Sequence, residues 1–254
     1  MSKNNDAKSC GCQQQQPQIN PHALDSAQDP SERFEVMHPP IILPKSSSTQ
    51  TSSSSSCNDS NSFDFDPYKD RPIPTSTYAA RAHVHKNALW HCSVHIWLVD
   101  PSASAMLLQK RSLTKDTFPG RWDISSAGHA EAGKGLAETA RLELAEELGV
   151  DDVKEAELTL AFVIPAEQAG MGGCNAYEHV YFLVWDRTNG NNEDGDTSQF
   201  ALGTAEVSEV VWMPVKEVLF ALRSGDDGYA PRTRMYVDVM EKELAKILGD
   251  GCLL

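Results

Sequence analysis

The chain has 254 residues, of which 40% are hydrophobic, and a formal net charge of −14. This length suits one ordinary domain with additional sequence, or at most two small domains. An acidic chain with an isoelectric point of about 4.9 binds nucleic acids and anionic membrane surfaces poorly, so we expect neither as a partner. A phosphate-containing substrate remains compatible with this charge if a divalent cation or a local basic patch offsets the repulsion.

The cysteines and the N-terminus indicate a soluble, cytoplasmic protein. The first 16 residues are polar and lack the apolar stretch of a signal peptide. No run approaches the roughly 18 apolar residues that cross a bilayer. The spacing of the six cysteines does not resemble a disulfide framework; they are Cys10, Cys12, Cys57, Cys92, Cys174 and Cys252.

Residues 1–75 are predicted to be mostly disordered. Gln13–Gln16 and Ser46–Ser56 can bury too little apolar area to offset the entropy lost on ordering. Within this region, Glu32–Met37 alternates polar and apolar residues and suggests a strand, which Pro39 and Pro40 end. The alternative is a chance pattern in a polar tail.

Residues 76–249 are predicted to form one ordered domain. Runs rich in β-branched and aromatic residues predict strands over 89–99, 105–111, 122–127, 158–164, 178–186 and 207–213. Apolar residues at helical spacing predict helices over 136–148, 215–223 and 231–248. A Gly-rich loop (168–174) and a polar loop (187–198) separate the later strands. This order predicts an α+β fold in which a mixed β-sheet is sandwiched between α-helices.

The helix over 136–148 carries the chemistry. Glu143, Glu146 and Glu147 stand at i, i+3 and i+4 and therefore share one face. Three carboxylates on one face repel each other, and a hard divalent cation such as Mg²⁺ removes this repulsion because it prefers oxygen ligands. Leu142, Ala145 and Leu148 are expected to form the opposite, apolar face. A solvated acidic helix face is the alternative when the glutamates are considered alone.

The surrounding segment Gly128–Val150 (GHAEAGKGLAETARLELAEELGV) resembles the Nudix box, G-x5-E-x7-R-E-U-x-E-E-x-G-U, where U is aliphatic. Seven motif positions are in register: Gly128, Glu143, Leu144, Glu146, Glu147, Gly149 and Val150. The resemblance implies a Nudix fold and a cofactor of Mg²⁺ or Mn²⁺. It implies that Glu143, Glu147 and the Gly128 carbonyl bind the metal, and that Glu146 and Glu147 are the catalytic residues.

Two positions depart from the box. Lys134 stands where the motif has Glu, and Leu142 stands where it has Arg. In the family this Arg helps to hold the acidic residues in position. Arg141 is one residue away, but one residue rotates a side chain by about 100° around a helix, so it is no simple substitute. The departures leave open a catalytically weakened Nudix-fold binding protein.

The wider segment 78–223 resembles the branch of Nudix proteins that is similar to isopentenyl-diphosphate isomerases. The similar stretches include Leu107–Arg111, Lys115–Asp123 and Glu206–Pro214. The isomerases need a cysteine at the place that Ala127 takes here, so isomerase chemistry is the less favoured alternative. Their metal-binding histidines have partial counterparts in His91 and His129, and less surely in His85. We interpret His91 and His129 as ordinary polar residues that line a pocket.

The resulting hypothesis is a Mg²⁺-dependent hydrolase that cleaves a small organic diphosphate, such as a nucleoside, isoprenoid or cofactor diphosphate. A metal-bound water would attack phosphorus, and one of the glutamates would accept its proton. Arg111 and Lys115 are predicted to contact the phosphates. His129 is predicted to line the substrate site, and Glu178 is a further acidic candidate there; Glu206 and Glu209 are weaker ones.

Overall fold

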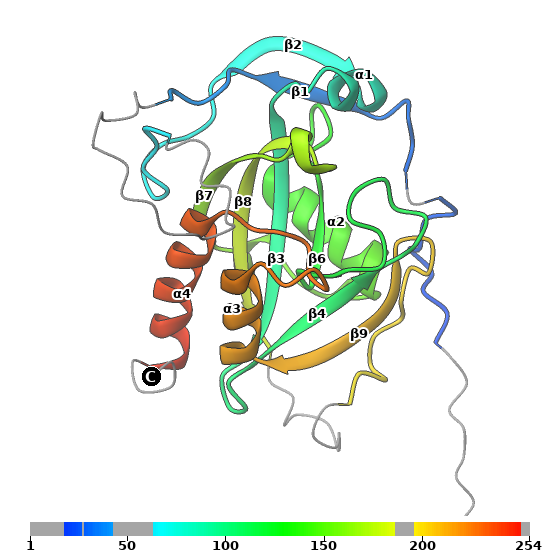
Figure 1. The fold of residues 1–254 in the computed structure, drawn as a ribbon. Helices are drawn as coiled ribbons and strands as arrows, with labels where there is room; N and C mark the ends of the chain where they lie inside the picture. Colours follow the sequence, from blue (N-terminus) through cyan, green and yellow to red (C-terminus); the bar gives the residue numbers. More distant parts are fainter. Residues whose placement is uncertain (1–17, 27, 43–62, 186–195, 250–254) are drawn as a thin grey trace, which may run out of the picture.

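A computed structural model describes residues 18–26, 28–42, 63–185 and 196–249. Seven strands form one mixed sheet in the order β5-β4-β3-β8-β7, with β6 paired to β3 and β9 paired to β4 (Figure 1). Only β3 and β8 pair in parallel among these neighbours. The strands are β3 (His91–Asp100), β4 (Ala105–Arg111), β5 (Trp122–Asp123), β6 (Ser126–His129), β7 (Leu160–Glu167), β8 (Asn175–Val184) and β9 (Val207–Pro214).

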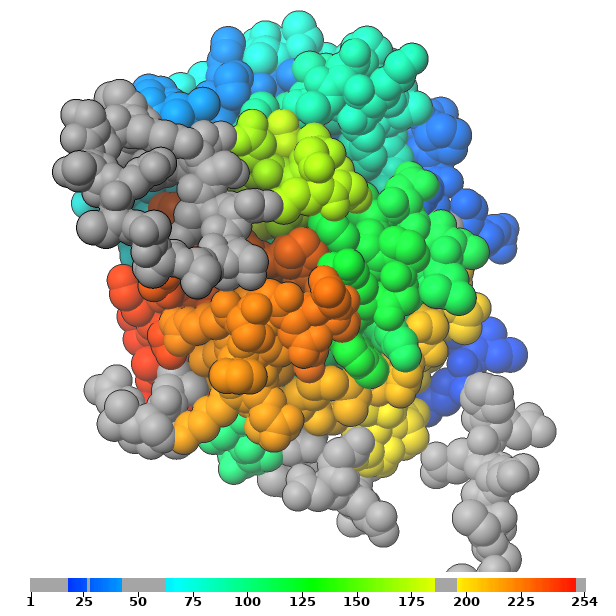
Figure 2. All heavy atoms as spheres, in the orientation of Figure 1, coloured from blue at the N-terminus to red at the C-terminus, as the bar shows by residue number. Residues whose placement is uncertain are grey.

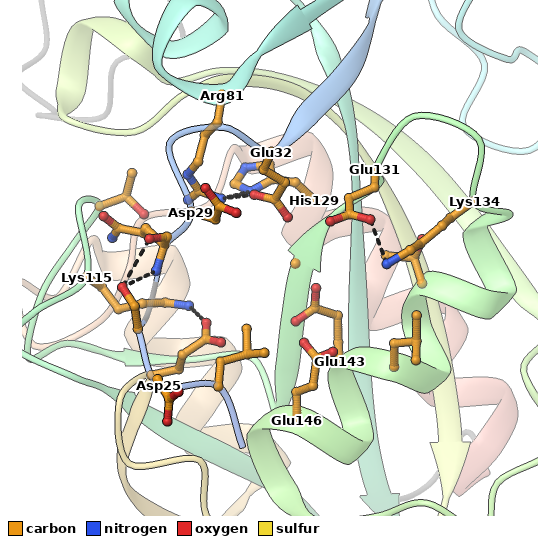
Figure 3. Close-up of a pocket in the computed structure, with 18 of the residues that line it drawn as sticks. Asp25, Asp29, Glu32, Arg81, Lys115, His129, Glu131, Lys134, Glu143 and Glu146 are labelled. Carbon is orange, nitrogen blue, oxygen red and sulfur yellow. Dashed lines mark hydrogen bonds and ion pairs between the residues drawn. The ribbon is translucent and has the colours of Figure 1, made fainter. Parts of the chain in front are cut away.

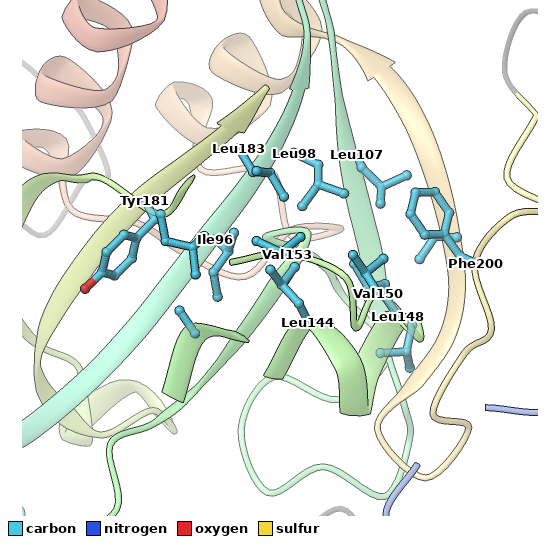
Figure 4. Close-up of a cluster of buried hydrophobic side chains, with 14 of the residues drawn as sticks. Ile96, Leu98, Leu107, Leu144, Leu148, Val150, Val153, Tyr181, Leu183 and Phe200 are labelled. Atoms are coloured by element: carbon cyan, nitrogen blue, oxygen red, sulfur yellow. The ribbon is translucent and has the colours of Figure 1, made fainter. Parts of the chain in front are cut away.

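Helices cover both faces of this sheet, as the α+β prediction requires. Helix α2 (Leu136–Leu148) lies on one face, and α3 (Val215–Ser224) and α4 (Arg234–Leu248) lie on the other (Figure 1). All ten residues of β3 are buried, since a central strand between two helical layers has no face in water. Leu144 and Leu148 of α2 pack on Ile96 and Leu98 of β3 (Figure 4). This packing holds α2 rigidly against the sheet.

A second, two-stranded sheet pairs β1 (Arg33–Met37) with β2 (Pro74–Ala80). The strand predicted over 32–37 is thus confirmed, and it pairs with a segment almost forty residues later. Helix α1 (Arg81–Lys86) follows β2 directly and buries Val84 against Phe34. Sequence patterns did not identify β2 or α1, because both are short and β2 is mostly exposed.

The described residues before β1 pack on the domain, in contrast to the disorder predicted for 1–30. Asn20 is buried, and its Nδ2 donates hydrogen bonds of 2.9 Å to the carbonyls of Ala145 and Glu146 in α2. Figure 2 shows this N-terminal stretch in blue beside the green and yellow segments. Phe63 and Phe65, also within the region 1–75 that was predicted to be mostly disordered, pack on Trp90 and Tyr177 respectively. The runs Gln13–Gln16 and Ser46–Ser56 lie outside the described residues.

Several strand predictions need revised boundaries, among them 158–164, which is observed as β7 (Leu160–Glu167). The strand predicted over 122–127 is divided into β5 and β6, because the buried Ser125 hydroxyl bonds to the backbone of Leu98 and Leu107. Strand β8 begins three residues before the predicted Glu178. Gly149 ends α2 with φ of 70°, in the left-handed region that favours glycine. Across the described segments, no helix has the length and apolar character needed to cross a bilayer.

Candidate active site

Two of the box glutamates, Glu143 and Glu146, project from α2 into the cavity beside the helix (Figure 3). Glu147 is fully buried, and its Oε2 accepts hydrogen bonds of 2.9 Å from Gln109 Nε2 and from the Ala127 backbone N–H. Its Oε1 is buried and has no hydrogen-bond partner among the described residues. One oxygen is therefore fixed by the sheet, whereas the other accepts no hydrogen bond and has the Lys115 ammonium 3.5 Å away.

Gly128 lies directly against Glu143. A Cβ built on Gly128 would come within 1.8 Å of Glu143 Oε1, so the carboxylate fills the space that any side chain would need. The glycine of the box is required here by this close approach and not by a left-handed backbone, which it does not adopt. Gly128 and Glu143, to which the Nudix resemblance assigns metal binding, are thus in close contact.

The carboxylates strongly influence one another. Burial raises the pKa of Glu143 well above its ordinary value, and the neighbouring Glu147 and Glu206 raise it further. Burial likewise raises the pKa of Glu146 and Glu147, with Glu206 contributing to both. Buried carboxylates that raise each other's pKa favour a bound cation, since positive charge stabilises their ionised forms. The donor set is all oxygen, which suits Mg²⁺ or Mn²⁺.

The expected division of α2 into an acidic and an apolar face is wrong in two places. Glu147 is among the buried residues of the helix, whereas Leu142 is only half-buried and lines the cavity in front of the glutamates. Leu144 takes the place in the core that we assigned to Leu142. The helix is oriented so that the Glu147 side chain points into the sheet, where Gln109 Nε2 donates a hydrogen bond to its carboxylate.

A cavity of about 410 Å³ opens in front of the glutamates and is lined by residues from several elements. Arg111, Lys115 and His129, three of the predicted substrate-binding residues, line it together with Glu143 and Glu146. The N-terminal stretch adds Asp25, Asp29 and Glu32 to one wall (Figure 3). Lys134, the second departure from the box, lies at the edge and forms an ion pair with Glu131 at 2.6 Å.

Arg111 and Lys115 are both engaged with protein groups. Arg111 donates to Thr117 through Nε at 2.8 Å and to Asp123 Oδ2 through Nη1 at 3.1 Å. Lys115 Nζ contacts Glu206 and lies 3.5 Å from Glu147 Oε1. Neither cation is therefore directed freely into the cavity.

Glu178 lies in an adjoining, smaller cavity of about 70 Å³ that shares Gly128 and His129 with the first. Burial raises its pKa to about 7, although Arg232 opposes the shift. Its Oε1 lies 3.8 Å from His95 Nε2, and its Oε2 is buried without a hydrogen-bond partner among the described residues. Glu209 lies apart from both cavities, paired with Lys110.

His129 lines both cavities, as expected for a polar pocket residue, and the fold brings it together with His85 and His91, the other two partial counterparts of the isomerase histidines. His85 of α1, His91 of β3, His129 of β6 and Cys174 each place one possible ligand atom within 4.8 Å of the others. Nε2 of His85 and of His91 is buried with no hydrogen-bond partner in the described part of the chain. Three imidazoles and a thiol form a donor set suited to Zn²⁺.

Burial keeps these imidazoles neutral, which is the form that binds metals. It lowers the pKa of His85 to about 4 and of His91 to about 3, and holds that of His129 well below its ordinary value. Phe34 stacks on the His91 ring, with centroids 5.1 Å apart, and closes one side of the group. Cys174 had no signal in the sequence that linked it to the histidines; only the fold brings it to them.

Residues 89–233 match the NUDIX domain family, so more than half of the chain is covered and the chain belongs to the Nudix hydrolase family. Nudix hydrolase 3 of Arabidopsis thaliana is 35% identical over 160 residues, which is 62% of this chain but only 20% of that relative. The Nudix hydrolase YfcD of Escherichia coli (strain K12) is 31% identical over 140 residues, or 55% of this chain and 68% of YfcD.

Solved structures are similar to this chain at low sequence identity. The crystal structure of DR0079 from Deinococcus radiodurans is 18% identical and has a TM-score of 0.49, covering 83% of this chain and 98% of DR0079. The MutT protein from Methanosarcina mazei Go1 is 18% identical, with a TM-score of 0.43, over 63% of this chain and 96% of its own.

Proposed function

We propose that this chain hydrolyses the phosphorus–oxygen anhydride of a small organic diphosphate and depends on Mg²⁺ or Mn²⁺. The observation that carries the proposal is the buried Oε1 of Glu147, which accepts no hydrogen bond from the described residues and lies in a group of carboxylates that raise one another's pKa. Lys115 Nζ, at 3.5 Å, also pairs with Glu206, so a bound cation would add the charge compensation that these buried carboxylates still need.

Glu143, Glu147 and the Gly128 carbonyl would hold the ion. Bound there, it would lower the pKa of a water molecule and neutralise charge on the phosphates. Glu147 is held by Gln109 and Ala127 and does not need to move for this role. Glu146 is half-buried and lines the cavity, so it is the better placed of the two catalytic candidates to accept a proton from the attacking water.

Substrate contacts would come from the cavity wall. His129 lines both cavities, and Glu178 faces the smaller one, so a substrate that extends from the glutamates past His129 would reach Glu178. Arg111 lies on β4, and its Nη1 and Nη2 already donate to Asp123 and Thr117. It could bind a substrate phosphate only if these N–H groups also donated to the phosphate. The cytoplasmic location remains a prediction from the sequence.

The test is phosphate release with Mg²⁺ over isopentenyl diphosphate, thiamine diphosphate, nucleoside diphosphate sugars and dinucleotides. We expect turnover of at least one compound, its loss in Glu147→Gln, and its retention in Glu155→Gln, a matched change of an exposed glutamate. No turnover by the wild-type protein, combined with thermal stabilisation by one compound, would refute hydrolysis in favour of a binding protein.

Two observations bear on the alternative readings. Ala127, which takes the place of the isomerase cysteine, contributes only its backbone N–H to Glu147 and has no titratable group. Formation of an allylic isomer from isopentenyl diphosphate without phosphate release would nevertheless establish the isomerase reading. The hypothesis of a catalytically weakened binding protein rests on Leu142 and Lys134. Despite Leu142, Glu147 keeps its hydrogen bonds from Gln109 and Ala127, and Glu143 stays packed against Gly128. Another residue must therefore take over the role of the missing arginine.

A further inference from the structure

The carboxylate cluster lacks a cation at the box position of its own helix, since Arg141 is one residue away and is therefore rotated by about 100° around the helix from position 142. Position 142 carries leucine, and the last turn of α2 contains no basic residue. Yet Glu147 is fully buried and Glu206 is 6% exposed, so neither carboxylate can rely on water to stabilise its charge. A counter-charge must come from another element of the fold.

Lys115 is in the right place to supply it. This residue lies in the loop between β4 and β5, and its side chain is only 9% exposed. Its Nζ forms an ion pair with Glu206 Oε2 and lies 3.5 Å from Glu147 Oε1. An ammonium group that is buried between two carboxylates is stabilised by both, and it stabilises both in return.

The backbone fixes this arrangement from both sides. Ser112 N–H donates to the Glu206 carbonyl at 2.8 Å, and Thr114 Oγ1 donates to the Ala205 carbonyl at 2.9 Å, so the Lys115 loop is tied to the segment before β9. Gly203 N–H in turn donates to the Glu147 carbonyl at 3.0 Å.

Gly203 permits this last contact because it has no side chain. A Cβ built on it would lie 2.2 Å from the carbonyl oxygen of Glu146. The loop that carries Lys115, the segment that carries Glu206 and the end of α2 are therefore connected in one chain of contacts. The backbone contacts of its loop therefore fix the position of Lys115 beside the glutamates.

We infer that Lys115 is a positioning residue that holds Glu147 and Glu206 in the site and supplies, from the β4–β5 loop, the positive charge that position 142 lacks. The inference rests on the proposed function in so far as the glutamates serve a metal-dependent reaction. It differs from our prediction that Lys115 contacts the phosphates of the substrate. A positioning residue affects kcat, whereas a phosphate contact chiefly affects KM.

The first experiment measures the melting temperature of metal-free protein in EDTA. Lys115→Met leaves Glu147 and Glu206 without their counter-charge, and we expect its melting temperature to fall by about 5 °C or more. Lys115→Arg should stay close to wild type. The matched control is Lys110→Met, because Lys110 pairs with Glu209 at 3.7 Å near the surface and does not contact the cluster.

Two additions separate a counter-charge from a merely structural lysine. Mn²⁺ should narrow the difference between Lys115→Met and wild type, since the ion supplies the missing positive charge. Leu142→Arg should recover part of the loss in the Lys115→Met background, because it restores the cation of the box. If Lys115→Met alone yields no folded protein, recovery of folded protein in this double variant is the deciding result. Equal melting of Lys115→Met and Lys110→Met, with and without Mn²⁺, would overturn the inference.

The second experiment uses turnover of whichever diphosphate the wild-type protein hydrolyses. We expect kcat to fall about 30-fold in Lys115→Met while KM changes less than about threefold. A raised KM at unchanged kcat would overturn the inference and assign Lys115 to the phosphates. Absence of turnover in the wild-type protein would refute the proposed function alone, since the melting experiments would still decide the role of Lys115.

Discussion

Substitution of Gly128 by alanine tests the contact at the centre of the site. The new Cβ would lie 1.8 Å from Glu143 Oε1 and 2.0 Å from its Cδ, whereas ordinary contact begins near 3.4 Å. The carboxylate must therefore move by about 1.6 Å, since the backbone of β6 is fixed by its pairing with β3. Metal–ligand distances tolerate deviations of only about 0.2 Å, so Glu143 would no longer bind the ion in its present position.

We expect two consequences of measurable size. A misplacement of about 1 Å in a catalytic group costs on the order of 100-fold in rate, so kcat/KM should fall by about that factor. Overpacking of a filled site typically costs about 1–3 kcal/mol, so the free energy of unfolding should fall within that range. Mn²⁺ titration followed by electron paramagnetic resonance measures the loss of metal affinity, and urea denaturation measures the loss of stability.

The control is Gly170→Ala, because nothing lies within 4 Å of a Cβ on Gly170 and its backbone is not left-handed. A double variant isolates the clash itself. In a Glu143→Ala background the carboxylate is gone, so adding Gly128→Ala should cost little further stability. The close contact between Gly128 and Glu143 would be refuted if Gly128→Ala matched Gly170→Ala in turnover, metal affinity and stability.

Three further outcomes follow from the buried polar groups. Cys174→Ser should abolish thiolate-to-cobalt absorption when Co²⁺ is added as a probe of the His–Cys group, because Cys174 is its one sulfur ligand. Asp123→Asn should lower the free energy of unfolding by about 3 kcal/mol, as it leaves the buried Arg111 and Arg232 without their shared carboxylate. Burial lowers the pKa of His179 to about 4, below its ordinary 6.5. The neutral ring therefore contributes fully to stability above pH 6.5, and this contribution is lost as the pH falls toward 4. The free energy of unfolding should accordingly fall by about 2 kcal/mol between pH 7 and pH 5.

Each of these outcomes has a matched control. Cys92→Ser leaves the His–Cys group intact and should keep the cobalt absorption. Asp238→Asn changes an exposed ion pair with Arg223 and should cost less than about 1 kcal/mol. His179→Gln should remove its share of the acid sensitivity measured by urea denaturation, while a change of the exposed His83 should not. An acid sensitivity that is the same in wild type and His179→Gln would contradict the assignment.

The amino-acid sequence by itself determined the secondary structure that positions the box. Period-2 and period-3.6 patterns identified the long strands and the three long helices, because each element buries one face or lies wholly in the core. The spacing of Glu143, Glu146 and Glu147 determined that they share one side of α2. The close fit of Gly128 against Glu143 agrees with the motif, although the motif gives no physical reason for it.

Only the tertiary structure decided which of these glutamates are buried and which groups compensate their charge. The orientation of α2 buries Glu147 and leaves Leu142 half-buried beside the cavity, and the burial of Glu147 depends on a hydrogen bond from Gln109 in β4. The approach of Lys115 to Glu147 and Glu206 joins residues that are up to 91 positions apart. Such contacts have no local periodicity, because they arise where the loop after β4 and the segment before β9 meet the end of α2. A sequence pattern describes one element at a time, whereas the free energy of a buried charge depends on all the elements around it.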